Sequence, residues 1–89
     1  MDTRLEKRLS VRRNTFIEAT IVFDGGRNRT PCIIRNLSET GAKLEVVSGV
    51  AAIPRTFDLV VPKVRPQNCL VMWRTLKELG VQFQDPVSR

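Results

Sequence analysis

The sequence feature that most constrains the fold is a period of two in its apolar residues. Helical periodicity is absent almost everywhere after residue 14, whereas apolar and polar side chains alternate in six segments. Such alternation is typical of a β-strand with one buried face. The apolar positions of the six segments are Ile17, Ala19, Ile21 and Phe23; Cys32 and Ile34; Ala42, Leu44 and Val46; Phe57, Leu59 and Val61; Cys69, Val71 and Trp73; and Leu79, Val81 and Phe83. We therefore predict an all-β protein.

Turn residues and strand breakers separate these segments. Asp24-Gly25-Gly26 predicts a hairpin turn after the first strand, and Pro62 ends the fourth because it lacks a backbone N–H donor. Six strands laid out flat would leave two open edges, which closure into a barrel removes. We predict a small six-stranded antiparallel β-barrel over residues 14–84. An irregular basic N-terminal arm over residues 1–13 precedes it, and a C-terminal tail over residues 85–89 follows.

The charge balance indicates an anionic partner. Fifteen lysines and arginines outnumber nine acidic residues, which gives the 89-residue chain a net charge of +6. No apolar run is long enough to cross a bilayer, and the first residues lack the apolar segment of a secretory signal. We expect a single domain with no membrane span and a cytoplasmic location.

Residue types that most enzymes need are missing. The chain has no histidine and only two cysteines, Cys32 and Cys69, so it can assemble neither a zinc finger nor a histidine-based catalytic triad. Both cysteines fall in apolar runs, where a free cysteine behaves as a small buried residue. The acidic residues are scattered, and no nucleophile has a nearby base. We expect a non-enzymatic protein with reduced, structural cysteines, no metal and no cofactor.

A basic segment precedes the first strand and contains arginines four residues apart. Arg8 and Arg12 form one such pair, Arg4 and Arg8 another, and Arg13 adjoins the first pair. The arginine fork matches phosphate oxygens or the edge of guanine in bidentate fashion. We favour Arg8 and Arg12 because residues that lead into a rigid strand are positioned by it. The alternative is a solvated basic tail.

A polar turn, Asn36-Leu37-Ser38-Glu39-Thr40-Gly41, separates the second and third strands. Alternation puts Asn36 and Ser38 on the same side of the chain, where their side chains can bond backbone or a ligand. Gly41 permits either a positive φ or the close approach of another molecule's backbone. Taken alone, the segment is better explained as an ordinary Asx or Ser turn between the second and third strands, capped by a glycine.

Trp73 has two possible roles. It shares a phase with Cys69 and Val71, which predicts that it packs in the core. The alternative is that its indole provides a stacking surface for a nucleotide base.

Together, the arginine pair, the hairpin and the motif Asn36-x-Ser38-x-x-Gly41 resemble the signature of PilZ domains, the bacterial receptors for cyclic di-GMP. The resemblance covers nearly the whole chain and includes the strand that carries Trp73 and the closing strand Leu79-Gly80-Val81-Gln82-Phe83. It implies that Arg8 and Arg12 wrap the guanines and phosphates of the dinucleotide. Arg13 would add a phosphate contact or face solvent.

The resemblance also gives roles to the turn. Asn36 and Ser38 would bond a guanine edge, and Gly41 would keep the shape of the turn. One position departs from the family, whose commonest residue at the head of this motif is Asp rather than Asn36. A carboxylate accepts from both guanine donors, whereas an amide offers one acceptor oxygen. The substitution costs about 1 kcal/mol, or about fivefold in affinity, if that contact is used.

These observations give three functional hypotheses. The first is a non-enzymatic cyclic di-GMP receptor whose arm becomes ordered on binding and signals to a downstream protein partner of unknown identity. The second is an adaptor of the same fold that binds a protein and no nucleotide. The third is a small nucleic-acid-binding barrel. It ranks last because the four phenylalanines and single tryptophan fall mostly on core-facing phases, whereas such proteins interleave aromatic and basic residues.

Overall fold

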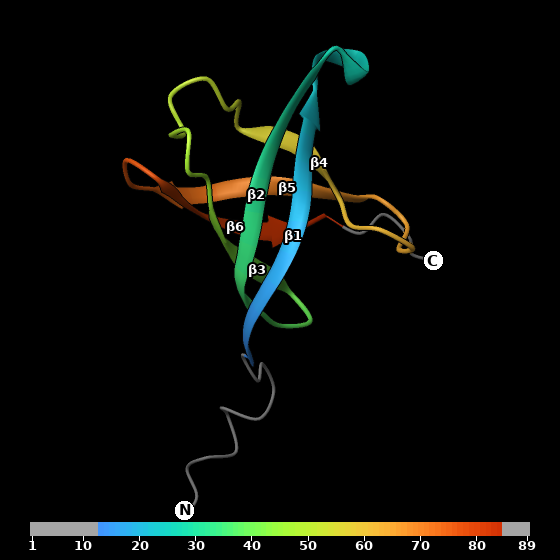
Figure 1. Ribbon diagram of the computed structural model, residues 1–89, viewed down its shortest axis with the longest axis vertical. Coiled ribbons are helices and arrows are strands. Elements are labelled where there is room, and N and C mark those ends of the chain that lie inside the picture. The colour runs from blue at the N-terminus through green and yellow to red at the C-terminus, as the bar shows by residue number, and fades with distance from the viewer. Residues whose placement is uncertain (1–12, 85–89) are drawn as a thin grey trace, which may run out of the picture.

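The computed structural model describes residues 13–84. Within them, six strands close into a barrel in the order β1-β2-β3-β6-β5-β4, and every neighbouring pair is antiparallel (Figure 1). The strands are β1 (Arg13–Phe23), β2 (Asn28–Leu37), β3 (Gly41–Glu45), β4 (Thr56–Val60), β5 (Gln67–Arg74) and β6 (Glu78–Phe83). The predicted all-β, six-stranded antiparallel barrel is confirmed. The predicted tail lies outside the described residues, as does the predicted arm apart from Arg13, which begins β1.

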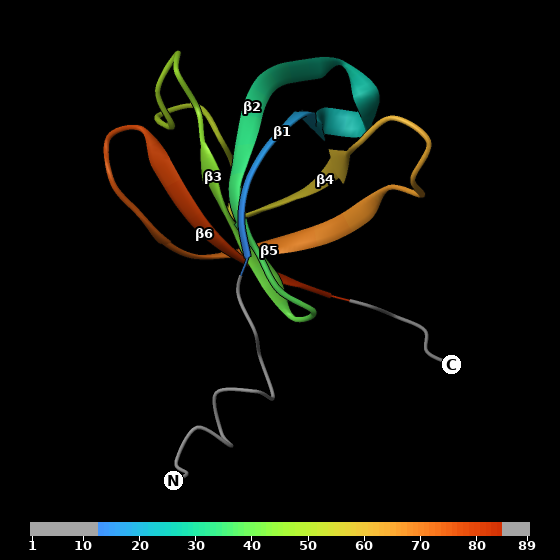
Figure 2. The same ribbon diagram turned by 60° about the horizontal axis from the view of Figure 1, so that its bottom comes forward.

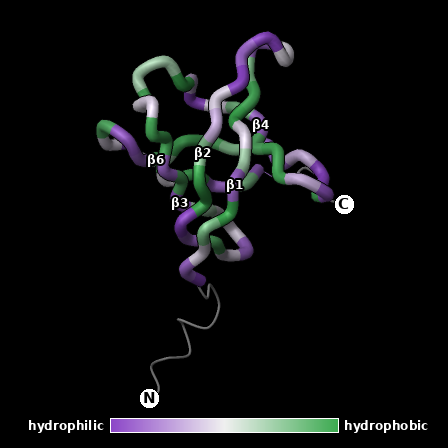
Figure 3. Tube along the Cα trace, in the orientation of Figure 1, coloured by the Kyte–Doolittle hydropathy of each residue, from purple (hydrophilic) through white to green (hydrophobic). Residues whose placement is uncertain are grey.

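The core lies inside the barrel and is built from the inward positions of the strands and from residues of the β3–β4 loop. Its buried apolar residues are Ala19, Ile21, Cys32, Ile34, Leu44, Val46, Val50, Ile53, Phe57, Leu59, Cys69, Val71, Leu79 and Val81. Figure 3 shows apolar and polar segments alternating along the strands, as the period of two predicts. Val46 and Val61, which the sequence places in strands, lie one residue beyond the ends of β3 and β4 but still pack in or against the core.

The β1–β2 hairpin turns where the sequence predicts it. Asp24–Gly26 forms a short 3-10 turn, η1, in which Asp24, Gly25 and Gly26 all have positive φ. Asn28 Nδ2 donates to Asp24 Oδ2 at 2.8 Å and fastens the turn. No helix among residues 13–84 has the length and apolarity that a membrane crossing requires.

Two loops cover one end of the barrel. The β3–β4 loop buries Val50 and Ile53, and the guanidinium of Arg74 donates to their carbonyls at 3.3 and 3.0 Å. The Val50 N–H donates to the carbonyl of Leu76 in the β5–β6 turn at 3.1 Å. Figure 2 shows this loop and the β5–β6 turn side by side. These bonds fasten the β3–β4 loop to β5 and to the β5–β6 turn.

Trp73 is not a core residue, so the prediction from its phase is wrong. Val71 pairs with Val81, but Trp73 pairs with Gly80, which leaves Met72 as an extra residue in β5. Such a bulge shifts the alternation by one, so that Met72 and Trp73 both face outward. They keep 57% and 46% of their surface exposed.

Cys32 and Cys69 are free and buried, as expected for structural cysteines. Burial raises the pKa of each thiol to about 12, and the negative charge of Asp58 adds to the rise at Cys69. A thiol with so high a pKa stays protonated at neutral pH and is a poor nucleophile.

Candidate functional site

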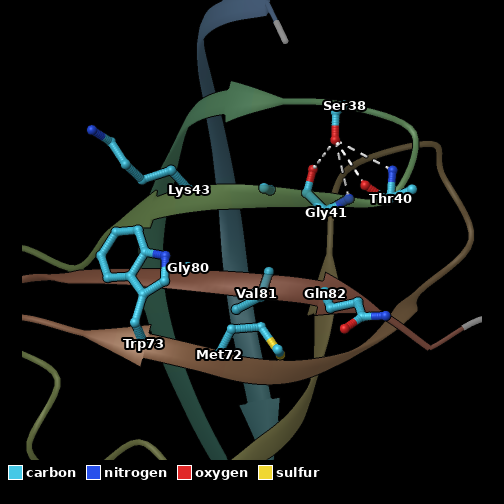
Figure 4. Close-up of a pocket in the computed structure, with 10 residues that line it drawn as sticks. Ser38, Thr40, Gly41, Lys43, Met72, Trp73, Gly80, Val81 and Gln82 are labelled. Carbon is cyan, nitrogen blue, oxygen red and sulfur yellow. Dashed lines mark hydrogen bonds between the residues drawn. The ribbon is translucent and has the colours of Figure 1, made fainter. Parts of the chain in front are cut away.

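Ser38 organises the turn between β2 and β3 through its hydroxyl group. The N–H groups of Gly41 and Thr40 donate to Ser38 Oγ at 3.2 and 3.3 Å, and the Ser38 N–H donates to the Gly41 carbonyl at 2.9 Å. Figure 4 shows the bonds that radiate from this hydroxyl. A serine that bonds the backbone ahead of it shapes a turn without a ligand. Ser38 therefore has a structural role here, and its contact with guanine stays a prediction.

Gly41 is required by close packing rather than by an unusual backbone angle. Its φ lies outside the left-handed region, and a Cβ added at this position would overlap the carbonyl oxygen of Val81 on β6. The close approach comes from this chain's own β6, and the predicted approach of another molecule's backbone stays a prediction. Any larger residue here must push the turn away from β6.

Asn36 is held in a fixed orientation by its amide group. Its Nδ2 donates to Asn14 Oδ1 at 3.1 Å and to the carbonyl of Arg35 at 2.6 Å. Because both amide hydrogens are used in this way, the Oδ1 atom is the part of the side chain left to meet a ligand.

One line of paired residues crosses the outer wall of the barrel, and we call it the outer row. Asn14 pairs with Asn36, Asn36 with Lys43, Lys43 with Gly80, and Gly80 with Trp73. Directly paired residues of antiparallel strands share a face of the sheet and lie about 5 Å apart. The members of the outer row therefore stand next to one another across β1, β2, β3, β6 and β5.

Irregularities in strand pairing gather at the outer row. The described barrel has three register shifts, which lie between Asn14 and Ile17, between Ile34 and Asn36, and between Val71 and Trp73. Bulges re-aim side chains and are common beside binding sites. Each of the three adjoins a member of the row, so the row is where the barrel departs most from regular alternation.

A hollow of about 270 Å³ lies on the outer surface beside the turn. Its walls come from β3, β5, β6 and the turn: Ser38, Thr40, Gly41, Ala42, Lys43, Met72, Trp73, Gly80, Val81 and Gln82. Figure 4 shows the turn at one end and Lys43 and Trp73 at the other, with the indole over Gly80. A Cβ on Gly80 would overlap the indole ring, so the glycine lets Trp73 lie flat on β6. We call this the tryptophan hollow.

A second hollow of about 490 Å³ contains Asn36 and adjoins the first. It is lined by Asn14, Thr15, Arg35, Asn36, Lys43, Glu45 and Glu78. Lys43 lines both hollows, so it borders the space beside Asn36 and the space beside Ser38 and Gly41. Asn36 and Ser38, which alternation places on one side of the chain, thus face adjoining spaces rather than a single one. We call this second space the amide hollow.

The start of β1 lies against the same part of the barrel. Arg13 pairs with Leu37, and the next residue pairs with Asn36. Arg8 and Arg12 lie outside the described residues, but the segment that carries them joins the barrel at this point. Of the six predicted site residues, the four that are described are therefore Arg13 beside Leu37, Asn36 in the amide hollow, and Ser38 and Gly41 in the tryptophan hollow.

Sequence reasoning missed Lys43 and placed Trp73 in the core. Gly80 was the available signal, because a glycine inside a strand marks a bulge or the close approach of another group. Nothing in the sequence distinguishes Lys43, because an outward-facing charged residue is ordinary in an alternating strand. Its importance depends on which residues pair with it across β2 and β6.

Comparison with known proteins agrees with this architecture. The family model of the PilZ domain matches residues 4–89, essentially the whole chain. No curated protein gives a significant match. The PilZ family is generally one of receptors for cyclic di-GMP, and its domains bind ligands rather than catalyse reactions. The barrel has the expected number of strands, and one of its bulges lies beside the Asn36-to-Gly41 motif. With the family match over residues 4–89, these findings show that this chain belongs to the PilZ domain family.

Proposed function

We propose that this domain is a cyclic di-GMP receptor that binds the dinucleotide in the tryptophan and amide hollows. The observation that carries the proposal is the position of Trp73. Its exposed indole lies flat over Gly80 and lines the same hollow as Ser38 and Gly41, the described part of the family motif. An exposed aromatic plane beside a polar turn suits a flat base with a hydrogen-bonding edge.

Each group of the ligand has a counterpart in this arrangement. Trp73 stacks on one guanine, and Asn36 Oδ1 accepts from the edge of a guanine in the amide hollow. Arg8 and Arg12 supply forks for phosphates and guanine edges, and Arg13 adds positive charge at the start of β1. The arm of residues 1–13 closes over the ligand and changes the surface offered to a downstream protein partner.

Isothermal titration calorimetry with cyclic di-GMP tests the proposal. The wild-type domain is expected to bind at low-micromolar concentration or tighter. Trp73→Ala and Arg12→Ala should both weaken binding, by about fivefold to over a hundredfold, because each removes an interaction worth about 1–3 kcal/mol. Leu76→Ala is the matched control, since this residue is 87% exposed in the β5–β6 turn and lines neither hollow. A wild-type domain that gives no heat and no ligand-dependent thermal shift would contradict the proposal.

The exposure of Trp73 and Phe16 also bears on the nucleic-acid hypothesis. These two aromatics face solvent, whereas Phe23, Phe57 and Phe83 pack in or against the core. Tight, salt-dependent binding of single-stranded DNA in place of the dinucleotide would favour that function. A melting temperature unchanged by the nucleotide, with binding to an acidic protein, would instead indicate an adaptor.

A further inference from the structure

Lys43 occupies the centre of the outer row. It pairs with Asn36 on one side and with Gly80, the floor beneath the indole of Trp73, on the other. A ligand that stacks on Trp73 and reaches the amide of Asn36 must therefore pass over Lys43. In a cyclic dinucleotide, the groups that connect the two bases are ribose and phosphate.

Lys43 is also the only cation that lines the tryptophan hollow within residues 13–84. In the amide hollow the other cation, Arg35, is already paired with Glu45 at 3.1 Å. A phosphate in the tryptophan hollow therefore has Lys43 as its cationic partner from the described barrel.

The present partner of Lys43 is a weakly placed carboxylate. Its Nζ lies 3.7 Å from Glu78 Oε2, and the two side chains are 34% and 39% exposed. Ion pairs this long and this exposed contribute little to stability. Lysine suits an exchange of partners because its ammonium sits on a flexible stem and carries three donors. Moving Nζ from Glu78 to a phosphate thus gives up a weak contact and forms a charge-assisted hydrogen bond.

We propose that Lys43 is a phosphate-binding residue of this site, and that Glu78 competes with the ligand phosphate for it. The inference rests on the proposed function and deepens it. Glu78 acts as an internal anion that holds Lys43 in the free protein and lowers the affinity for the dinucleotide. Binding transfers the ammonium from carboxylate to phosphate, which leaves Glu78 facing Glu45, its direct cross-strand partner.

A double-mutant cycle measured by titration with cyclic di-GMP tests the competition. Lys43→Gln should weaken binding about tenfold, and Lys43→Arg should stay within about threefold of wild type. Glu78→Gln should tighten binding about twofold to fivefold. In the Lys43→Gln background, Glu78→Gln should have no effect, because the group it releases is gone.

Two controls separate this mechanism from a general effect of net charge. Lys77→Gln removes a positive charge from the adjacent turn, and Glu18→Gln removes a negative charge from β1; both residues are exposed and line neither hollow. If Lys43→Gln weakens binding no more than Lys77→Gln, or Glu78→Gln tightens it no more than Glu18→Gln, the inference is overturned while the proposed function stands. If the wild-type domain does not bind cyclic di-GMP, both the proposed function and the inference about Lys43 and Glu78 are overturned. Equal melting temperatures among the variants exclude unfolding as the cause.

Discussion

The wall where β1 meets β4 and the wall that carries the outer row differ in how regularly their strands pair. Residues Thr20, Ile21 and Val22 pair with β4 in unbroken register, and alternate side chains point in and out. The outer row lies among all three register shifts of the described barrel. The regular wall contributes buried surface, whereas the irregular wall presents an amide, a lysine and an indole to solvent. The buried surface that stabilises the barrel and the proposed ligand site thus lie on different stretches of one sheet.

The largest effect is expected from breaking the regular wall. Ile21 is fully buried, and Ile21→Ala should lower the free energy of unfolding by about 2–5 kcal/mol through lost burial and a cavity. Urea denaturation measures this change. Because Ile21 touches neither hollow, the affinity of the folded fraction for cyclic di-GMP should stay at the wild-type value. A large loss of affinity would show that the two walls are not independent.

Gly41→Ala should have the next largest effect and should lower both the stability of the domain and its affinity for cyclic di-GMP. The added Cβ overlaps the carbonyl of Val81, so the turn must move away from β6, at a cost of about 1–3 kcal/mol in stability. Binding should fall as well because the turn lines the tryptophan hollow. Gly49→Ala serves as a comparison: it introduces backbone strain because Gly49 has a positive φ, but Gly49 lines neither hollow. A Gly41→Ala domain with wild-type melting temperature would refute the close-packing explanation.

Trp73→Ala should distinguish the two walls most clearly, because it should reduce binding far more than stability. It should weaken cyclic di-GMP binding by about 1–3 kcal/mol while changing stability much less than Ile21→Ala does, because the indole is half exposed. Trp73→Phe should recover part of the affinity, since it keeps an aromatic plane over Gly80. Calorimetric titration and thermal melts of both variants measure the separation. Equal losses in stability for Trp73→Ala and Ile21→Ala would show that Trp73 packs as a core residue and would contradict this prediction.

The smallest effect is expected from Asn36→Asp, and it is a gain. A carboxylate accepts from both guanine donors, so affinity should rise by up to about fivefold. The aspartate cannot donate to Asn14 or to the carbonyl of Arg35. Asn14 can turn its own amide to donate instead, but the bond to the Arg35 carbonyl is lost, so the free energy of unfolding should fall by about 1 kcal/mol. A fall in affinity would mean that the amide N–H groups of Asn36, rather than its Oδ1, serve the ligand.

The same contrast explains what the sequence could predict. Ile21 and Leu59 alternate strictly with polar neighbours, and so their strands and the closed barrel follow from pattern alone. Trp73 could not be placed, because the bulge at Met72 is a property of how β5 meets β6 and leaves no mark in β5 itself. Lys43 gained its position from cross-strand pairs that no local pattern contains. Asn36, Ser38 and Gly41 were found through a family resemblance rather than through geometry.

The bulge in β5 amounts to one amino acid, Met72. With one codon fewer, Trp73 would follow the inward-facing Val71 directly, and strict alternation would still point its indole outward, opposite Gly80. The extra residue adds a second outward side chain, Met72, to the wall of the tryptophan hollow, while Trp73 and Arg74 keep their partners on β6. A hollow on a barrel wall can thus gain a lining side chain through the insertion of one residue, with the strand pairs on either side preserved.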